Sequence, residues 1–595
     1  MSIFDVLALF GGLALFLFGM NVMGDGLTRA AGGKMERILE KLTSTPIKGV
    51  LLGAAVTAVI QSSSATTVMV VGFVNSGIMK LRQAVGIIMG ANIGTTVTSW
   101  ILSLSGIQGD SIWIQMLKPS SFSPILAVIG IAFLMFSKNE KKHDIGMIFL
   151  GFTILMYGMD AMSGAVAPLA DVPEFANVLL MFSNPVLGMI VGTLFTAIIQ
   201  SSSASVGILQ ALCMTGAVTY GTALPIIMGQ NIGTCVTALL SSIGAKKNAK
   251  RAAFVHLYFN LIGTILFMIV FYSINAFVNF GVLQDMATPA GIAVIHSIFN
   301  ILTTIVLLPF GKGLEKLATL TIREKEEPVE EIAELVSLKH LDARFLEQPA
   351  FAVTQSMDVM NQMAGYSAEA LYDSLELMKN YSDEKWQRVE ALEDIVDKYE
   401  DELGTYLAKV SGKELAEEDS KRVSNGLHCI GDLERISDHA LAIAEIYAKM
   451  HKEEMVFSDK AMAELNLYSN AVYEIMSMTC KALNEDDMKI AKRIEPLEEV
   501  INGLNATIKK QHIKRLQKGK CTIELGIALE NLLNNYERVA DHCSNVAASL
   551  LQVKTDSFDM HEYLNRVKQE SNVEFQAMYL SLIHISEPTR LGMIS

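Results

Sequence analysis

The sequence predicts an all-α protein in two parts: a polytopic membrane domain with two inverted repeats that contain re-entrant hairpins, followed by a soluble helical bundle. A change of composition, an internal duplication and a proline-poor helical pattern carry this prediction. Residues 1–310 hold 15 Lys and Arg against 11 Asp and Glu, whereas the remaining residues hold 33 against 51. An almost uncharged first half and an acidic second half indicate a membrane domain followed by a soluble domain.

The N-terminal segment Met1–Gly24 is apolar, but it lacks a basic region and a small-residue cleavage site. We therefore expect it to be the first membrane span and not a cleaved signal peptide. The six cysteines form no Cys-x-x-Cys pair, and four of them lie in the soluble half. This usage favours a reduced, cytosolic compartment over a disulfide scaffold.

The membrane half contains the same segment twice. TPIKGVLLGAAVTAVIQSSSATTVMVVGFVNSG, from Thr45, aligns without a gap with NPVLGMIVGTLFTAIIQSSSASVGILQALCMTG, from Asn184. The same offset carries Met89–Thr98 onto Met228–Thr237. One constant offset over this length indicates duplication. A weaker echo follows, because His256–Asn260 and His296–Asn300 share the pattern His-x-x-Phe-Asn.

Seven apolar stretches are long enough to cross a bilayer, which takes about 20 residues. They lie near residues 5–27, 84–104, 122–137, 146–168, 224–243, 252–273 and 290–310. Residues 46–78 and 185–218 are too long for one upright helix and too short for two spans, so we expect each to be a hairpin that enters and leaves on one side.

With both hairpins re-entrant, 14 of the 15 basic residues before residue 311 fall on the side of the C-terminal half, and Lys118 is the exception. The positive-inside rule makes that side cytoplasmic. Three crossings precede the second repeat, so it is expected to be inserted upside down. Inverted repeats with interrupted helices are the plan of secondary transporters, whose substrates lie near mid-membrane.

Each predicted hairpin carries a polar cluster at its centre, Gln61–Thr67 and Gln200–Ser205. A break in a membrane helix exposes backbone groups that must find partners or line a wet cavity. Helix N-termini just after the two glutamines would aim N–H groups at the midplane, which suits an oxyanion such as phosphate. Hydroxyl and amide oxygens also coordinate Na⁺. Because neither cluster contains a charged side chain, a co-bound cation would offset the charge of the anion.

Structural interpretations stay open beside these functional ones. Serine and threonine also form hydrogen bonds between membrane helices. In the paired Asn-Ile-Gly-Thr motifs, Gly94 and Gly233 would allow close helix packing. The simplest interpretation of His256 and His296 is an interhelical hydrogen bond.

The duplicated QSSS signature, followed each time by MG(A/Q)NIGT, resembles the sodium-dependent phosphate cotransporter family with the type II Na/Pi fold, over roughly residues 5–310. The resemblance implies re-entrant hairpins, inorganic phosphate as substrate and Na⁺ as coupling ion. The substrate and ion site that it implies consists of Gln61, Ser62, Ser63, Ser64, Thr66, Asn92, Thr95, Gln200, Ser201, Ser202, Ser203, Ser205, Asn231 and Thr234. Thr67 corresponds to Val206, so it is a weaker candidate.

Residues 311–344 are expected to form a charged linker, and residues 345–579 are helical by pattern. Asp432–His439 (DLERISDH) resembles the later segment Asn535–His542 (NYERVADH), so we expect two three-helix units. Each segment places two carboxylates at i and i+4 on one helix face. Two interpretations of these carboxylates stay open. Either they bind a hard or first-row divalent metal, or they form salt bridges with the neighbouring Arg435 and Arg538.

The two segments resemble PhoU, the bacterial phosphate-signalling helical protein, whose repeats carry metal-cluster motifs. The resemblance implies a divalent or iron-type metal as cofactor, with the candidate ligands Glu393, Asp397, Glu434, Asp438, Glu537 and Asp541. The second repeat departs from the motif, because Glu498 is followed by Asn502. A PhoU-like cytosolic domain fused to a transporter implies regulation of uptake by intracellular phosphate.

The favoured interpretation is a sodium-coupled symporter that imports phosphate across the cell membrane. The alternatives are a phosphate-responsive sensor or scaffold that signals through the PhoU-like domain, and a transporter of another oxyanion. Because the chain shows no nucleophile–base constellation, P-loop or HExxH motif, we expect no enzyme, and the acidic soluble half argues against nucleic-acid binding. The candidate protein partners are a second copy of the chain or a phosphate-signalling protein. The stretch LSLIHISEPTR (Leu580–Arg590) breaks the helical charge pattern, so residues 580–595 are expected to be a non-native tail.

Overall fold

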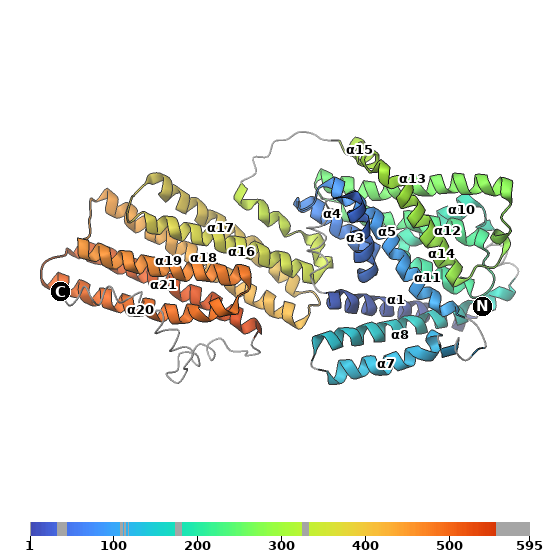
Figure 1. Cartoon of the computed structure of the whole chain (residues 1–595), viewed down its shortest axis with the longest axis horizontal. Helices are drawn as coiled ribbons and strands as arrows, with labels where there is room; N and C mark the ends of the chain where they lie inside the picture. The colour runs from blue at the N-terminus through green and yellow to red at the C-terminus, as the bar shows by residue number, and fades with distance from the viewer. Residues whose placement is uncertain are drawn as a thin grey trace. The chain divides into compact units, whose positions relative to one another are not determined.

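The computed structural model of the chain describes residues 2–31, 45–107, 111, 115–116, 118–137, 139–172, 181–323 and 333–554. Within these ranges the protein is all-helical, and the one β-bridge, between Thr219 and Met286, lies outside any strand (Figure 1). The all-α prediction is confirmed. The chain divides into two compact units, Met1–Val329 with Asp342–Phe351 and Glu330–Leu341 with Ala352–Ser595. The expected non-native tail and the basic residues 34, 37 and 41 lie outside the described residues.

The first unit holds the membrane helices. Among its described residues, seven helices are long and apolar enough to cross a membrane: α1 (Ile3–Ala31), α5 (Leu81–Ser103), α7 (Pro119–Phe136), α8 (Glu140–Val166), α12 (Tyr220–Ser241), α13 (Lys247–Val278) and α14 (Pro289–Leu307). Each predicted span has one of these helices. The chain then continues through a short 3-10 turn into α15 (Gly311–Thr321), so the expected charged linker begins with a helix of the first unit.

The two regions that the sequence predicts as hairpins each form two short helices. In the first repeat they are α3 (Pro46–Ile60) and α4 (Ser63–Ser76), and in the second α10 (Pro185–Ile199) and α11 (Ser202–Cys213). α3 and α10 begin in the same way, with proline at the first helical position and a polar side chain, from Thr45 or Asn184, that accepts a backbone N–H of the first turn. These are strong helix-start signals.

Glycines set the packing between the helices of each repeat. A Cβ atom on Gly53 of α3 would overlap the carbonyl oxygen of Ile87 on α5, and one on Gly192 of α10 would overlap that of Ile226 on α12. Gly94 and Gly233 of the Asn-Ile-Gly-Thr motifs approach the backbones of α3 and α10 equally closely. The packing interpretation of these two glycines is therefore confirmed. The duplication that the sequence shows is also a duplication of structure.

The second unit contains a bundle of long helices: α16 (Pro349–Glu376, whose first residues belong to the first unit), α17 (Asp383–Ser411), α18 (Glu417–Lys452), α19 (Asp459–Glu485), α20 (Met488–Gln517) and α21 (Ile523–Lys554). They follow one another as two sets of three. Buried tyrosines join the sets, because the hydroxyls of Tyr447 on α18 and Tyr536 on α21 lie 2.9 Å apart. All six cysteines of the chain are free thiols.

Candidate functional site

The polar clusters lie where the short helices break. α3 ends at Gln61 with φ 59° and ψ 17°, and α10 ends at Gln200 with φ 59° and ψ 20°. A non-glycine residue in this left-handed region is uncommon, and such residues gather at functional sites. New helices begin directly after both glutamines, as the sequence predicts. The two copies therefore share an unusual backbone and not only a run of serines.

The N-termini of α4 and α11 are capped in the same way. The Ser62 hydroxyl accepts the N–H of Ala65 at 3.2 Å, and the Ser201 hydroxyl accepts that of Ala204 at 3.2 Å. Ser62 and Ser201 thus act as helix caps. The N–H groups of the two residues that follow each cap have no carbonyl acceptor within their own helix. These N–H groups belong to Ser63, Ser64, Ser202 and Ser203.

The hydroxyls of these four serines make no side-chain hydrogen bond within the described residues. Ser63, Ser202 and Ser203 are nevertheless buried. Each helix start therefore presents two hydroxyls and two backbone N–H groups. Such a group of neutral donors suits an oxyanion, and the hydroxyl oxygens can also coordinate a small hard cation.

Thr66 and Ser205 play a different part. The Thr57 hydroxyl donates to Thr66 Oγ1 at 3.0 Å, and the Thr196 hydroxyl donates to Ser205 Oγ at 2.8 Å. These bonds join the two helices on either side of each break. Thr66 also donates to the Ser62 carbonyl at 3.0 Å.

The Asn-Ile-Gly-Thr motifs meet the His-x-x-Phe-Asn segments. Asn92 Nδ2 donates to Asn260 Oδ1 at 2.6 Å, and Asn231 Nδ2 donates to Asn300 Oδ1 at 2.8 Å. Thr95 and Thr234 instead donate to the backbone of their own helices. Asn260 and Asn300 are site neighbours that sequence reasoning missed, although the repeated His-x-x-Phe-Asn pattern was their signal.

The two copies differ around their glutamines. Gln61 is 5% exposed and its Oε1 accepts the Thr98 hydroxyl at 2.9 Å. Gln200 is exposed, and Thr237, the counterpart of Thr98, has a buried hydroxyl without a partner. Thr98 is thus a contact of Gln61 that the sequence did not single out. The two copies therefore share the backbone of the break but differ in the side-chain contacts of their glutamines.

The histidines differ as well. His296 Nδ1 lies 2.7 Å from the Ser99 hydroxyl, which confirms the expected interhelical hydrogen bond. For His256 that expectation is wrong, because both of its ring nitrogens are buried without a partner. The physical reason is a difference between the two repeats. In the second repeat, the position equivalent to Ser99 is Ala238, which has no hydroxyl.

Each of the two helices that begin with the serines packs against helices of the other repeat. α4 of the first repeat contacts α12 and α13, and α11 of the second repeat contacts α5. Gln210 of α11 fixes this arrangement, since its Nε2 donates to the Ser99 carbonyl at 3.1 Å and to the Pro289 carbonyl at 2.9 Å. Each polar helix start therefore belongs to a helix that packs against the other repeat.

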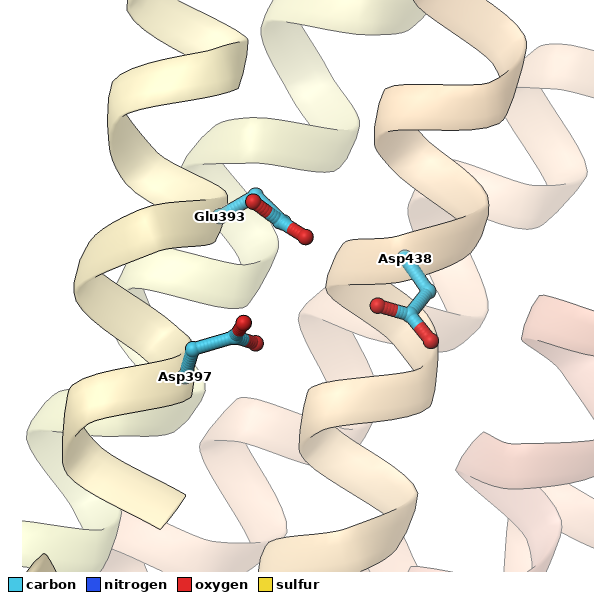
Figure 2. A group of neighbouring side chains, drawn as sticks. All are labelled: Glu393, Asp397 and Asp438. Atoms are coloured by element: carbon cyan, nitrogen blue, oxygen red, sulfur yellow. The ribbon is translucent and has the colours of Figure 1, made fainter. Parts of the chain in front are cut away.

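A second candidate site lies in the helical bundle. The carboxylates of Glu393 and Asp397 on α17 and of Asp438 on α18 come within 4.8 Å of one another and face each other across the two helices (Figure 2). Burial, and then the neighbouring carboxylates of Asp397 and Asp394, raise the pKa of Glu393 to about 7. Burial and Asp438 likewise raise the pKa of Asp397. A divalent cation would relieve this repulsion.

The alternative interpretation, in which Arg435 forms salt bridges with Glu434 and Asp438, has partial support. Arg435 lies 3.5 Å from Glu434 and 3.4 Å from Asp438, but its side chain is largely exposed, so the pairs are weak. Burial and the Asp438 charge raise the pKa of Glu434.

The second set of three helices in the bundle carries a different acidic group. Glu537 accepts Asn505 Nδ2 at 2.5 Å, and Arg538 lies 3.4 Å from Asp541. Neither carboxylate joins a group of three within the described residues. Glu495, Glu498 and Glu499 of α20 do form such a group, and Glu498 accepts Asn502 Nδ2. The sequence signal for this group was the run Glu-Pro-Leu-Glu-Glu.

Comparisons with known proteins agree with the family resemblances of both halves of the chain. The Na+/Pi-cotransporter family model matches residues 15–164 and 170–285, and the PhoU domain model matches residues 360–447 and 465–550. The "Putative inorganic phosphate export protein YjbB" of Salmonella typhimurium is 24% identical over 94% of this chain and 99% of its own length. The "Uncharacterized protein YqeW" of Bacillus subtilis is 31% identical over 53% of this chain and 97% of its own.

The "Sodium-dependent phosphate transport protein 2A" of Rattus norvegicus is 39% identical over 16% of this chain and 15% of its own length. No solved structure gives a significant match. The Na+/Pi family is a family of membrane transporters with phosphate as substrate and not a family of enzymes, which confirms both expectations at that level. The chain belongs to the Na+/Pi-cotransporter family and carries a C-terminal PhoU domain.

Proposed function

We propose that the protein is a sodium-coupled symporter that imports inorganic phosphate across the cytoplasmic membrane, and that its PhoU domain is cytosolic and regulates this uptake. The observation that carries the proposal is the duplicated break at Gln61 and Gln200. Both breaks open onto a helix start with two hydroxyls that have no side-chain hydrogen bond.

The geometry supports phosphate as follows. A helix start offers oriented N–H groups and a partial positive charge, which favour an anion without a basic side chain. Ser63, Ser64, Ser202 and Ser203 would supply further donors. A site without charged side chains binds a divalent anion more easily when Na⁺ lies beside it. The serine hydroxyls and the amide oxygens of Gln61 and Asn92 are the oxygen ligands available for Na⁺. The relative named as a sodium-dependent transport protein supports Na⁺ in this place.

The topology is part of the proposal. Two re-entrant hairpins in repeats of opposite orientation would bring both helix starts to the middle of the membrane. The close glycine contacts of α3 with α5 and of α10 with α12 support two equivalent structural units. In the PhoU domain, Glu393, Asp397, Glu434 and Asp438 would hold a divalent or iron-type metal, for which the raised pKa of Glu393 is the support.

Export is a second candidate direction. The relatives that match 94% of the chain carry names that say phosphate export. A coupled carrier runs in the direction that its combined gradients dictate, so the same site serves either direction.

The test is labelled phosphate flux in proteoliposomes that contain the full chain. An inward Na⁺ gradient is expected to drive accumulation, and replacing Na⁺ with K⁺ is expected to abolish it. Competition by arsenate but not by sulfate would identify phosphate as the substrate class. Accumulation that is equal in Na⁺ and K⁺ would refute sodium coupling, and phosphate loss from loaded vesicles only under an outward gradient would favour export.

A further inference from the structure

A short segment of the chain returns to the membrane unit after leaving it. The 3-10 helix η5 (Ala333–His340) belongs to the second unit, Asp342–Phe351 belongs to the first, and α16 from Ala352 onward belongs to the second again. We call Asp342–Phe351 the latch. It contains the short 3-10 helix η6 (Ala343–Glu347), which Asp342 caps.

An aromatic side chain anchors the latch on α4. Phe345 is fully buried, and its ring lies where Gly72 of α4 has no side chain, since a Cβ on Gly72 would come within 2.7 Å of Phe345 Cε1. The ring centroid of Phe345 lies 5.3 Å from that of Phe73 and 4.9 Å from that of Phe351. The rings of Phe73 and Phe351 also pack edge to face. Three rings in mutual contact make a stable, water-free anchor.

Polar contacts extend the anchor to the other repeat. Asp342 accepts Asn75 Nδ2 at 2.6 Å, and Asn75 Oδ1 accepts the backbone N–H of Lys246, which directly precedes α13, at 2.8 Å. Arg344 pairs with Asp342 at 2.8 Å and donates through Nε to the carbonyl of Ser241, the last residue of α12, at 2.8 Å. The latch therefore ties α4 of the first repeat to the end of α12 in the second.

The second repeat has no such docking surface. In the gapless alignment of the two repeats, Gly72 becomes Ala211, Phe73 becomes Leu212 and Asn75 becomes Met214. The recess for the ring and the amide for Asp342 are both absent there. The surface is thus a feature of the first hairpin alone and not a by-product of the duplication.

Along the chain, both ends of the latch continue into elements of the second unit. On one side, Glu334 of η5 pairs with Arg388 of α17 at 3.0 Å, and the Tyr399 hydroxyl donates to the Glu334 carbonyl at 2.6 Å. On the other side, the latch runs without a break into α16. α17 also carries Glu393 and Asp397 of the carboxylate group.

We propose that the latch is the element through which the PhoU domain restrains transport, by holding α4 against the end of α12. This inference rests on the proposed function. α4 is one uninterrupted helix of 14 residues, with Ser63 and Ser64 at its start and the latch contacts at its end. Alternating access requires the repeats to move against each other, and a tie between α4 and α12 opposes that motion.

The test compares initial rates of sodium-dependent phosphate uptake by full-length variants in proteoliposomes. Phe345→Ala removes the ring, and Gly72→Ala fills the recess for the ring without changing any residue of the latch. Each is expected to raise the rate about threefold or more, since the loss of an aromatic contact of this kind changes an equilibrium about threefold to tenfold. The double variant is expected to be no faster than either single variant, because both remove the same contact.

Glu347→Ala, an exposed position in the same segment, is the matched control and should leave the rate unchanged. Arg388→Ala removes the ion pair to Glu334 and should raise the rate. Unchanged or lowered rates in Phe345→Ala and Gly72→Ala would overturn the latch, and an unchanged rate in Arg388→Ala would overturn its control by the PhoU domain.

Amide hydrogen exchange separates this inference from the proposed function. If no form of the protein transports phosphate with sodium, the proposed function fails, but exchange still reports on the latch. Phe345→Ala should then speed exchange in the C-terminal half of α4 and at the end of α12, whereas Glu347→Ala should not. Equal protection in both variants would overturn the latch.

Discussion

The hydroxyl of Thr57 donates to Oγ1 of Thr66 at 3.0 Å across the break between α3 and α4. The same relationship recurs in the second repeat between Thr196 and Ser205 at 2.8 Å. A hydroxyl at these positions therefore fixes the two helices of each hairpin relative to one another. This use separates Thr66 and Ser205 from the serines at the helix starts, whose hydroxyls have no side-chain hydrogen bond.

Thr66→Val tests this positioning role. The substitution keeps the shape but removes the hydrogen bonds to Thr57 and to the Ser62 carbonyl. Each bond is worth about 1 kcal/mol, so the uptake rate should fall at least about fivefold. Thr66→Ser should retain most of the rate. Thr319→Val is the control, since Thr319 donates only to the backbone of α15 and its loss should leave uptake unchanged. Equal rates in Thr66→Val and wild type would show that the bond is dispensable.

Gln61→Gly separates the backbone of the break from its side chain. Glycine adopts positive φ without strain, which offsets the loss of the hydrogen bond from Thr98, so the free energy of unfolding should stay within about 1 kcal/mol of wild type. Uptake should nevertheless fall, because the amide that accepts the Thr98 hydroxyl is gone. Gln61→Val should lose both stability and uptake, since a β-branched residue is strained at this φ. Thermal unfolding in detergent and uptake are measured together, and a Gln61→Gly protein with full uptake would remove the amide from the site.

Gly53→Ala should destabilise the membrane unit by about 1–3 kcal/mol, since the added methyl would overlap the Ile87 carbonyl. Gly164→Ala on α8 is the matched control, because no atom lies within 4 Å of the position of its Cβ. The melting temperatures of the two variants in detergent give the comparison. Similar melting temperatures would contradict the close approach of α3 and α5.

The pKa of Glu393 predicts how the PhoU domain responds to pH and metal. Because the folded-state pKa is raised from 4.5 to about 7, the folded domain binds more protons than the unfolded chain between these values. Without metal, stability should therefore fall as pH rises from about 4.5 to 7. Glu393→Gln should flatten this dependence and raise the melting temperature at pH 8.

Added Mn²⁺ at pH 8 should stabilise the wild-type protein and not Glu393→Gln. Glu390→Gln serves as the control, since it lies outside the carboxylate group and should behave as wild type. Identical melting curves with Mn²⁺ and with EDTA would argue against a metal at Glu393, Asp397 and Asp438.

Local patterns were sufficient to predict the membrane helices and the two breaks. A run of about 20 apolar residues and a polar cluster at a repeated offset are properties of contiguous sequence. All seven spans and both breaks at Gln61 and Gln200 follow from them. The packing glycines of the Asn-Ile-Gly-Thr motifs belong to the same class, because close helix contact requires small residues at fixed spacing.

Long-range partners were not predictable in this way. The partner of Asn92 is Asn260, far along the chain, and that of Gln61 is Thr98 on a different helix. Only tertiary packing decides such pairs. The same holds for His256, whose buried ring nitrogens have no partner, and for Phe345, whose binding recess depends on the missing side chain of Gly72.

Sodium-dependent phosphate uptake by Ser63→Ala, Ser202→Ala and the double variant in proteoliposomes shows whether the two helix starts act together on phosphate. If both helix starts form one site, each single variant should lower uptake at least about tenfold, since a hydrogen bond to a charged group is worth about 1.5–3 kcal/mol. The double variant should be inactive while keeping the wild-type melting temperature. Ser105→Ala, whose hydroxyl donates to the Leu102 carbonyl, should transport as wild type. Full uptake by the double variant would contradict the account.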